Sequence, residues 1–261
     1  MTGDAVLVLG ATGPSGICLL RELLHRKHRA IAYVRSPSKI PDDLKSNPLL
    51  EIVHSRIDHH PSLSQALSRA RAVISFLGPS PQTVLGTLTL FAWLGPPLPY
   101  PAYYADDILP LMQTHGVRRI LALSTLSATV SDEDDPRGEG DRFVLSRWFA
   151  RVLVKVVVPK AYWAMVGIAR VFGELRGREG VDLDWTVFRV PMLLGGADDE
   201  SWRKERDEEK GVYAGPIRRG VWKGVIGRAR LARWCVDWLE TGGDGEWKGR
   251  MPAVCDASRD R

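Results

Sequence analysis

The feature that most constrains the fold is a glycine-rich turn close to the start of the sequence. Residues 10–16, Gly-Ala-Thr-Gly-Pro-Ser-Gly, follow an apolar run from Ala5 to Leu9 and precede a stretch, Gly16 to His25, whose apolar residues recur at helical spacing. A buried strand, a tight glycine turn and an amphipathic helix in this order open the βαβ unit that binds dinucleotides. A strand-to-helix turn without a ligand is the alternative, and the complete context disfavours it.

Each glycine of the turn has a physical role in this prediction. Gly10 permits the tight turn, Gly13 lets the backbone approach the pyrophosphate, and Gly16 allows close packing of helix on strand. The helix then begins at the phosphates, where its free N–H groups and positive dipole end attract negative charge. We therefore predict that this turn contributes the following cofactor-binding residues: Gly10, Thr12, Gly13, Pro14, Ser15 and Gly16.

Strands and helices alternate along the chain, which predicts an α/β fold with a doubly wound parallel sheet of the Rossmann type. Further strands are predicted over 30–34, 50–55, 72–77, 119–123 and 185–189, and helices over 62–68, 104–115 and 228–240. Residues 141–178 are predicted to be largely helical, with an exposed loop at 131–141 and an irregular insertion at 79–101. The charged stretch 198–210 is predicted to be a solvated excursion.

A chain of 261 residues fits one domain. We predict a Rossmann core of about 1–130 plus 180–195 and a small C-terminal substrate lobe of about 131–180 and 196–255.

The end of the second predicted strand selects the cofactor. Sites for NAD usually place an acidic residue there, whereas sites for NADP place an arginine. Here Arg35 offers a planar fork to the 2′-phosphate, Ser36 offers a hydroxyl and Lys39 a second charge, and no acid occurs before Asp42. We therefore predict NADP(H); for Lys39 an ordinary exposed lysine is an equal alternative.

Other strand ends line the same edge of a parallel sheet. Asp58, after the third strand, is predicted to accept from the adenine amine, although a surface aspartate is nearly as well supported. Leu77 and Gly78 end the fourth strand, where a glycine permits backbone approach to the ribose. Ser124 ends the fifth strand and places a hydroxyl near the expected nicotinamide.

Composition restricts the partners. The net charge of +5 suits an anionic ligand, but Lys and Arg are mixed with acids rather than clustered, so we expect no nucleic acid. Three dispersed cysteines predict a reducing compartment, a cytoplasmic protein and no metal site. No stretch is long and apolar enough to predict stable membrane insertion, although 148–169 allows contact with a membrane surface.

Four stretches resemble the atypical short-chain dehydrogenase/reductases of the NmrA-like group. They are Val6 to Gly16, Val34-Arg35-Ser36, Leu123-Ser124-Thr125 and Leu183 to Pro191, and the resemblance extends to about Leu194. The Asp-Trp-Thr-x-x-Arg-x-Pro string within 184–191 is the more specific of these motifs. The resemblance implies that Pro191 passes beside the nicotinamide and that the segment beyond forms the substrate lobe.

The chain departs from the wider superfamily at the catalytic pair. Its enzymes use Tyr-x-x-x-Lys, in which the tyrosine transfers a proton and the lysine lowers its pKa. The register implied by the resemblance puts Val166 and Arg170 at these positions, and valine cannot transfer a proton. Tyr162 lies one helical turn earlier, so Ser124, Tyr162 or a substrate hydroxyl would supply the proton.

Two functions of different class remain open. The first is an NADP(H)-dependent oxidoreductase acting on a small aromatic or quinone-like molecule, of a type found in secondary metabolism. The second is a non-catalytic NADP(H)-binding redox sensor of the NmrA-like type, which the missing pair favours. The predicted partners are a small-molecule substrate and either a homodimer partner or another protein. The apolar segments of the chain favour the enzyme.

Overall fold

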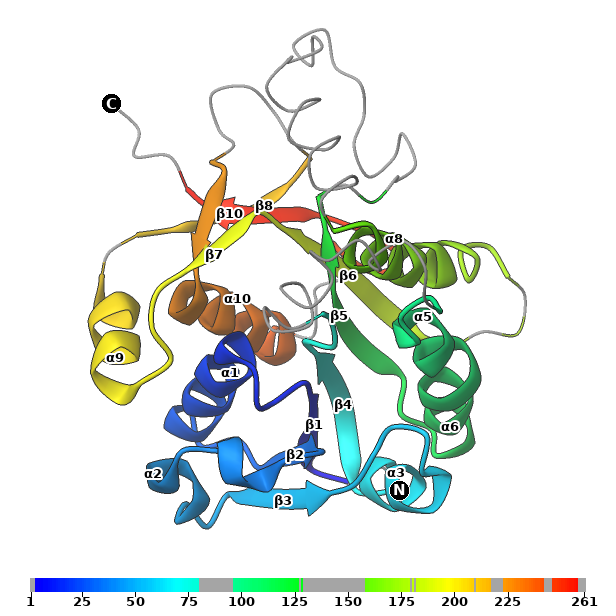
Figure 1. Cartoon of the computed structure of the whole chain (residues 1–261), viewed down its shortest axis with the longest axis horizontal. Helices are drawn as coiled ribbons and strands as arrows, with labels where there is room; N and C mark the ends of the chain where they lie inside the picture. The colour runs from blue at the N-terminus through cyan, green and yellow to red at the C-terminus, as the bar shows by residue number, and fades with distance from the viewer. Residues whose placement is uncertain are drawn as a thin grey trace, which may run out of the picture.

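The computed structural model describes residues 3–79, 96–126, 128, 158–178, 180, 182–208, 210–216, 223–241 and 246–257. Its centre is an eight-stranded sheet with the order β3-β2-β1-β4-β5-β6-β10-β8 (Figure 1). The strands are β1 (Ala5–Leu9), β2 (Ala30–Val34), β3 (Leu50–His54), β4 (Ala70–Ser75), β5 (Arg119–Thr125), β6 (Asp184–Val190), β8 (Val212–Gly215) and β10 (Ala253–Asp256). Neighbouring strands are parallel except for the antiparallel pair β10 and β8.

The predicted doubly wound Rossmann sheet is therefore confirmed. The strand order reverses between β1 and β4, where Leu9 pairs with Ser75. Open parallel sheets bind ligands beyond the carboxyl ends of the strands at such a reversal. β1 and β2 have the predicted bounds, and the other predicted strands are found with their ends shifted by no more than two residues.

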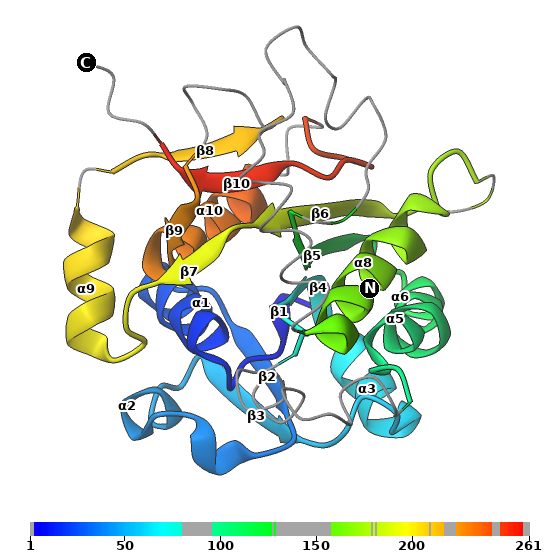
Figure 2. The same ribbon diagram turned by 45° about the horizontal axis from the view of Figure 1, so that its top comes forward.

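Helices cover both faces of the sheet (Figures 1 and 2). On one face lie α1 (Pro14–His25), α9 (Asp199–Asp207) and α10 (Arg228–Glu240); on the other lie α3 (His60–Leu67), α6 (Leu109–Thr114) and α8 (Pro159–Gly173). β1 is buried on both faces, since Val6 and Val8 join the core beneath α1 whereas Leu7 and Leu9 join the core beneath α3 and α8. An apolar strand without alternation is typical of such a central position.

Shorter elements complete the described chain. η1 (Pro37–Lys39) and α2 (Asp42–Lys45) connect β2 to β3, and β7 (Met192–Leu194) pairs with β9 (Val225–Gly227) in a separate parallel ribbon. The predicted helix 104–115 begins earlier, as α5 (Tyr100–Ala102), and continues through the wider turns of η3 (Tyr103–Ile108) into α6. The wider turns precede Pro110, whose nitrogen has no hydrogen to donate to the helix.

The stretch 198–210 is not merely a solvated excursion. Most of it forms α9, whose amino end is capped by the Asp198 carboxylate, which accepts from the Ser201 N–H at 2.8 Å. Trp202 is buried in this helix and contacts His25 of α1, with 5.7 Å between ring centroids. Glu205 of the same helix is also buried, and the charged composition of the stretch indicated neither residue.

The predicted lobe segment 196–255 is also divided differently. α10 has its predicted bounds, but it packs beside α1, and β8 and β10 extend the main sheet beyond β6. These elements therefore belong to the layers of the main sheet. The sequence did not predict β8 and β10, because such short strands carry too few residues to show a periodic pattern. The predicted loop 131–141, the helical stretch 141–157 and most of the insertion 79–101 lie outside the described residues.

Within the ranges given above, the structure has no helix that is both long and apolar enough to cross a bilayer.

Candidate functional site

The glycine turn between β1 and α1 has a geometry that only glycine fits. Gly10 adopts φ +75°, and a Cβ there would lie 2.6 Å from the carbonyl oxygen of Phe76. A Cβ on Gly16 would lie 2.3 Å from the carbonyl oxygen of Gly10. The Gly13 N–H donates to that same Gly10 carbonyl at 3.2 Å, which closes the turn. Helix and strand therefore approach closely, as the sequence predicted.

The amino end of α1 is shaped for an anion. Gly13 is the capping residue and makes no side-chain capping bond, Pro14 follows it, and the first turn carries no acid. Uncapped first-turn N–H groups and the positive end of the helix dipole attract phosphate. Thr12 is half-buried, Pro14 is exposed and Ser15 is buried at this end. The structure thus brings together all the turn residues that the sequence assigned to the cofactor.

The predicted 2′-phosphate residues follow β2. Arg35 and Lys39 are exposed, and Ser36 is half-buried at the start of η1. The imidazole Nε2 of His54 lies 3.2 Å from the Arg35 carbonyl oxygen and fixes the backbone at this point. Arg35 therefore follows β2, the neighbour of the strand that leads into the glycine turn, on a backbone held by His54.

Asp58 has a partner that the sequence analysis missed. Arg56 donates through Nε to Oδ1 at 3.0 Å and through Nη2 to Oδ2 at 2.8 Å, and this pairing holds the pKa of Asp58 below its usual value. Each carboxylate oxygen can accept more than one hydrogen bond, so Asp58 keeps acceptor capacity for the adenine amine. Arg56 could have been singled out in the sequence, because it lies just beyond the third strand and Arg35 just beyond the second, and these strands are neighbours in the sheet.

The ends of β4 and β5 meet α8. A Cβ on Gly78 would lie 3.1 Å from the sulfur of Met165, and Leu77 beside it is half-buried. The Ser124 hydroxyl is fully buried and donates to the Met165 carbonyl oxygen at 2.9 Å. The hydroxyl hydrogen of Ser124 therefore anchors α8 to β5 instead of pointing at a substrate. The sequence analysis did not single out Met165, whose position depends on how α8 packs.

The helix α8 carries the remaining candidates. The two positions of the Tyr-x-x-x-Lys pair hold Val166, which is buried, and Arg170, which is exposed, so the pair itself is absent from them. Tyr162 is half-buried one turn before Val166, and its ring contacts Trp163 edge-on with 5.1 Å between centroids. Tyr162 is the one phenol side chain within α8 and lies one helical turn before Val166.

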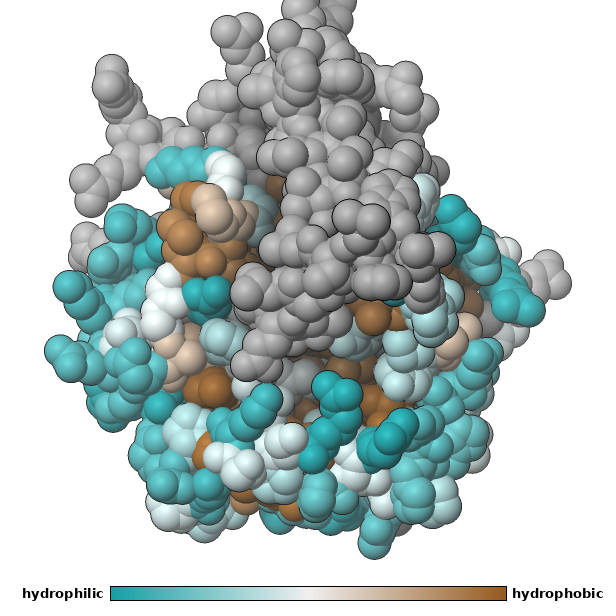
Figure 3. Space-filling view, in the orientation of Figure 1, coloured by the Kyte–Doolittle hydropathy of each residue, from teal (hydrophilic) through white to brown (hydrophobic). Residues whose placement is uncertain are grey.

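An apolar ledge follows β6. Pro191 is half-buried and leads directly into β7, where Met192 is 63 % and Leu194 45 % exposed. Figure 3 shows the corresponding hydrophobic patch over β7. Trp163 on α8 is likewise 48 % exposed. Exposed large apolar side chains of this kind are typical of ligand or partner contacts.

The cysteines are free and buried, and burial raises the pKa of Cys18 to about 12. Such thiols are chemically inert. Across the described part of the chain, no group of His, Cys, Asp and Glu is placed to hold a metal ion.

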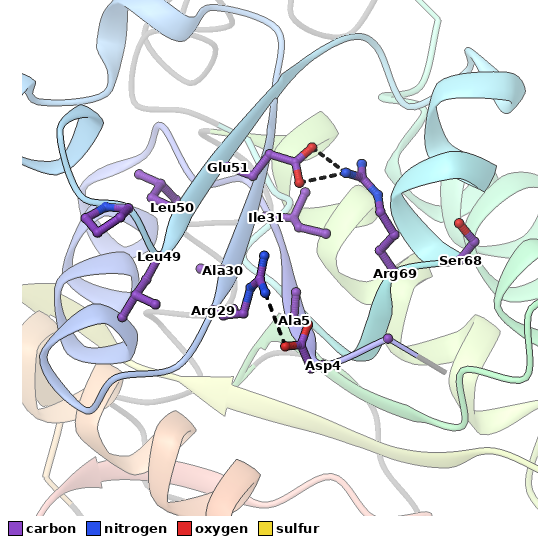
Figure 4. Close-up of a pocket in the computed structure, with 12 residues that line it drawn as sticks. Asp4, Ala5, Arg29, Ala30, Ile31, Leu49, Leu50, Glu51, Ser68 and Arg69 are labelled. Atoms are coloured by element: carbon purple, nitrogen blue, oxygen red, sulfur yellow. Dashed lines mark hydrogen bonds and ion pairs between the residues drawn. The ribbon is translucent and has the colours of Figure 1, made fainter. Parts of the chain in front are cut away.

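A hollow of about 280 Å³ lies at the opposite edge of the sheet (Figure 4). It is lined at the amino ends of β1 to β3 by residues that include Ala5, Ile31 and Leu50, and by the ion pair between Arg69 and Glu51. The Arg69 Nη1 lies 2.6 Å from the Glu51 carboxylate. Because parallel sheets bind cofactors beyond the carboxyl ends, this hollow is not the dinucleotide site.

Comparison with known proteins agrees with this geometry. A family described as NAD(P)H-binding matches residues 10–241. The chain belongs to this NAD(P)H-binding family. No curated protein sequence matches the chain at a significant level.

Solved structures show the same fold at low sequence identity. A short-chain dehydrogenase/reductase from Veillonella parvula in complex with NADP is similar with a TM-score of 0.66 and 14 % identity, covering 97 % of this chain and 94 % of that one. A protein from Bacillus halodurans that is described as an NAD-dependent epimerase/dehydratase has a TM-score of 0.62 and 18 % identity, covering 97 % of this chain and 94 % of that one. An oxidoreductase from Lactococcus lactis has a TM-score of 0.60 and 16 % identity, with coverage of 98 % and 91 %. The class is thus an NAD(P)-binding Rossmann protein with the fold of these enzymes.

Proposed function

We propose that the protein is an NADP(H)-dependent oxidoreductase of the atypical, NmrA-like short-chain dehydrogenase type that acts on a small aromatic or quinone-like molecule. The proposal is carried by an exposed arginine, Arg35, directly after β2, together with a glycine turn at the end of the neighbouring β1 that admits no Cβ at Gly10 or Gly16. A close-approach turn fits the pyrophosphate, and an arginine at the end of β2 fits a 2′-phosphate better than a ribose diol.

The roles of the side chains follow from their positions. NADPH, when bound, supplies a hydride to an electron-poor carbon or oxygen-bearing ring of the substrate. The turn residues and Arg35 would hold the pyrophosphate and 2′-phosphate, with Ser36 and Lys39 adding a hydroxyl and a charge. Gly78 and Leu77 would line the ribose, and Ser124 would position α8 through the Met165 carbonyl. For the proton we propose Tyr162, since Ser124 is engaged.

The apolar ledge supports the substrate class. Met192 and Leu194 of β7 are exposed directly beyond Pro191, which the family resemblance puts beside the nicotinamide. Met165 adds a thioether at Gly78. Thioether and aliphatic side chains contact flat rings favourably, and small-molecule sites are lined mainly by such groups.

Turnover tests this proposal. Purified protein is mixed with NADPH and a panel of quinones, flavins and aromatic ketones, and the loss of absorbance at the reduced nicotinamide band is followed. We expect consumption with at least one aromatic or quinone acceptor and a slower rate with NADH. Tight NADPH binding with no consumption on any acceptor would contradict the enzyme proposal.

A second function is favoured by α8. Valine at the superfamily tyrosine position is buried, and the neighbouring Ser124 hydroxyl donates to the main chain. Both features suit a redox sensor that binds NADP(H) and passes its state to a protein partner. Binding without turnover, together with a different proteolysis pattern for the NADP⁺ and NADPH complexes, would support the sensor.

We further propose a cytoplasmic protein with a role in secondary metabolism. Three free cysteines support a reducing compartment. We also propose that its partners are a small-molecule substrate and either a second copy of the chain or a protein partner, without nucleic acid or stable membrane insertion. Sedimentation at several concentrations tests the homodimer.

A further inference from the structure

Two arginines leave the sheet on adjacent strands. β2 and β3 pair in parallel with Val34 opposite His54, and the Ser55 N–H donates to the Val34 carbonyl at 3.0 Å. Arg35 and Arg56 therefore emerge close together at the carboxyl edge. The backbone of each is held, since the Tyr33 hydroxyl donates to the Arg56 carbonyl at 2.8 Å and His54 contacts the Arg35 carbonyl.

The two hydrogen bonds from Arg56 to Asp58 orient the guanidinium of Arg56 and contribute little to the stability of the fold. The side chains of Arg56 and Asp58 are 71 % and 47 % exposed, and an exposed ion pair contributes little to stability. The pairing uses one hydrogen of Nε and one of Nη2. The rest of the guanidinium N–H groups remain available to a ligand, in a fixed plane.

Two tyrosines of the connection before α6, Tyr100 and Tyr103, pack against the core on the face of the sheet that α3 and α8 cover. The rings of Tyr100 and Tyr103 are perpendicular, with 6.3 Å between centroids. Burial raises the pKa of Tyr100 while the charge of Arg35 opposes that rise, and Tyr103 acts electrostatically on Arg56.

The tyrosines are held in place by α8 and α3. A Cβ on Gly167 would lie 2.6 Å from the Pro101 ring, so α5 and α8 are in close contact. His60 at the start of α3 pairs with Asp107 of η3 at 2.5 Å between Nε2 and Oδ1. The segment that carries the two tyrosines is therefore held by α8 at one end and by α3 at the other.

We propose that Arg35 and Arg56 together bind the 2′-phosphate of NADP(H). This inference rests on the proposed NADP(H) function and deepens it. A phosphate monoester carries close to two negative charges and several acceptor oxygens, which two planar guanidinium groups match better than one. Asp58 orients Arg56 and retains acceptor capacity for the adenine amine.

Binding of cofactor fragments tests the second arginine. The affinities of 2′,5′-ADP and 5′-AMP are measured by calorimetry for the wild type, Arg56→Ala and Arg56→Lys, because these fragments need no turnover. We expect Arg56→Ala to weaken 2′,5′-ADP about tenfold, the typical effect of losing one charged hydrogen-bond donor, and to leave 5′-AMP within about twofold. Arg56→Lys should recover only part of the loss, since lysine lacks the fork.

Arg69→Ala is the matched control. Arg69 also pairs with an exposed carboxylate, since its Nη1 donates to both oxygens of Glu51, but at the amino edge of the sheet (Figure 4). Its removal should leave both fragment affinities unchanged. Equal weakening of 2′,5′-ADP and 5′-AMP by Arg56→Ala, or no weakening of either, would overturn the two-arginine site.

The two proposals can fail separately. If wild-type protein binds 2′,5′-ADP no better than 5′-AMP, the NADP(H) proposal itself fails. If the wild type prefers 2′,5′-ADP and Arg35→Ala removes that preference while Arg56→Ala does not, only the role of Arg56 is overturned.

Discussion

The two halves of the carboxyl edge are built differently. Beyond β1, β2 and β3 the chain presents a glycine turn and exposed cations on held loops, which leaves main-chain donors and charge to a ligand. Beyond β4 and β5 the polar group at the strand end is used internally, because the Ser124 hydroxyl donates to α8. The edge beyond β1 to β3 is therefore available to a ligand, whereas the edge beyond β4 and β5 is organised by packing. Under the proposed function these are the adenosine half and the nicotinamide half of the site. Cofactor binding and catalysis can be separated experimentally in such a molecule.

The largest effect is expected at the glycine turn. Gly10→Ala would put a Cβ 2.6 Å from the Phe76 carbonyl oxygen at φ +75°, a conformation that costs an L-residue about 1–2 kcal/mol before the clash is counted. We expect a loss of about 3 kcal/mol in the free energy of unfolding and a loss of NADPH affinity of about a hundredfold. Denaturant unfolding and fluorescence titration measure both.

Gly116→Ala is the control for this change. Gly116 has φ +68°, but a Cβ there would meet no atom within 4 Å. Its substitution should cost about 1 kcal/mol of stability with unchanged NADPH affinity. Equal affinity losses in Gly10→Ala and Gly116→Ala would show that the turn is not specific to the cofactor.

The next effect concerns the nicotinamide half. If Tyr162 supplies the proton, Tyr162→Phe should lower turnover about a hundredfold, the low end of the range for general acid catalysis, without changing NADPH affinity. Steady-state rates on an accepted substrate and a binding titration on the same preparation measure the two quantities. Full turnover by Tyr162→Phe would remove Tyr162 from the reaction and leave a substrate hydroxyl or solvent as the proton source.

A smaller effect is expected at Ser124. Ser124→Ala removes one buried hydrogen bond to the Met165 carbonyl, so the free energy of unfolding should fall by about 1 kcal/mol, and by more if the carbonyl stays unsatisfied. Turnover should change far less than in Tyr162→Phe. A loss of about a hundredfold in rate at unchanged stability would restore Ser124 as a catalytic residue.

The sequence predicted the strands and the helix around the glycine turn because their determinants are local. β1, the glycine turn and α1 adjoin in the chain, and Arg35 directly follows β2. α10 was predicted with its observed bounds because its apolar residues recur at helical spacing. Such features depend on residues a few positions apart.

The remaining features depend on long-range packing. The Ser124 hydroxyl meets a carbonyl 41 residues away, and no local pattern announces this contact. The fork between Arg56 and Asp58 requires the side-chain geometry of an exposed loop, and the burial of Trp202 requires α1 as a neighbour. β8 and β10 are too short for periodicity, so their place in the main sheet was missed.

The central claim, that the adenosine half selects NADP(H), is tested most directly by comparing cofactors. NADPH and NADH are titrated against the intrinsic tryptophan fluorescence of the wild type and of Arg35→Ala. We predict that the wild type binds NADPH at least about tenfold more tightly than NADH and that Arg35→Ala removes most of this difference, as expected for a charged contact to the 2′-phosphate. Equal or tighter binding of NADH by the wild type, or an unchanged preference in Arg35→Ala, would contradict the account.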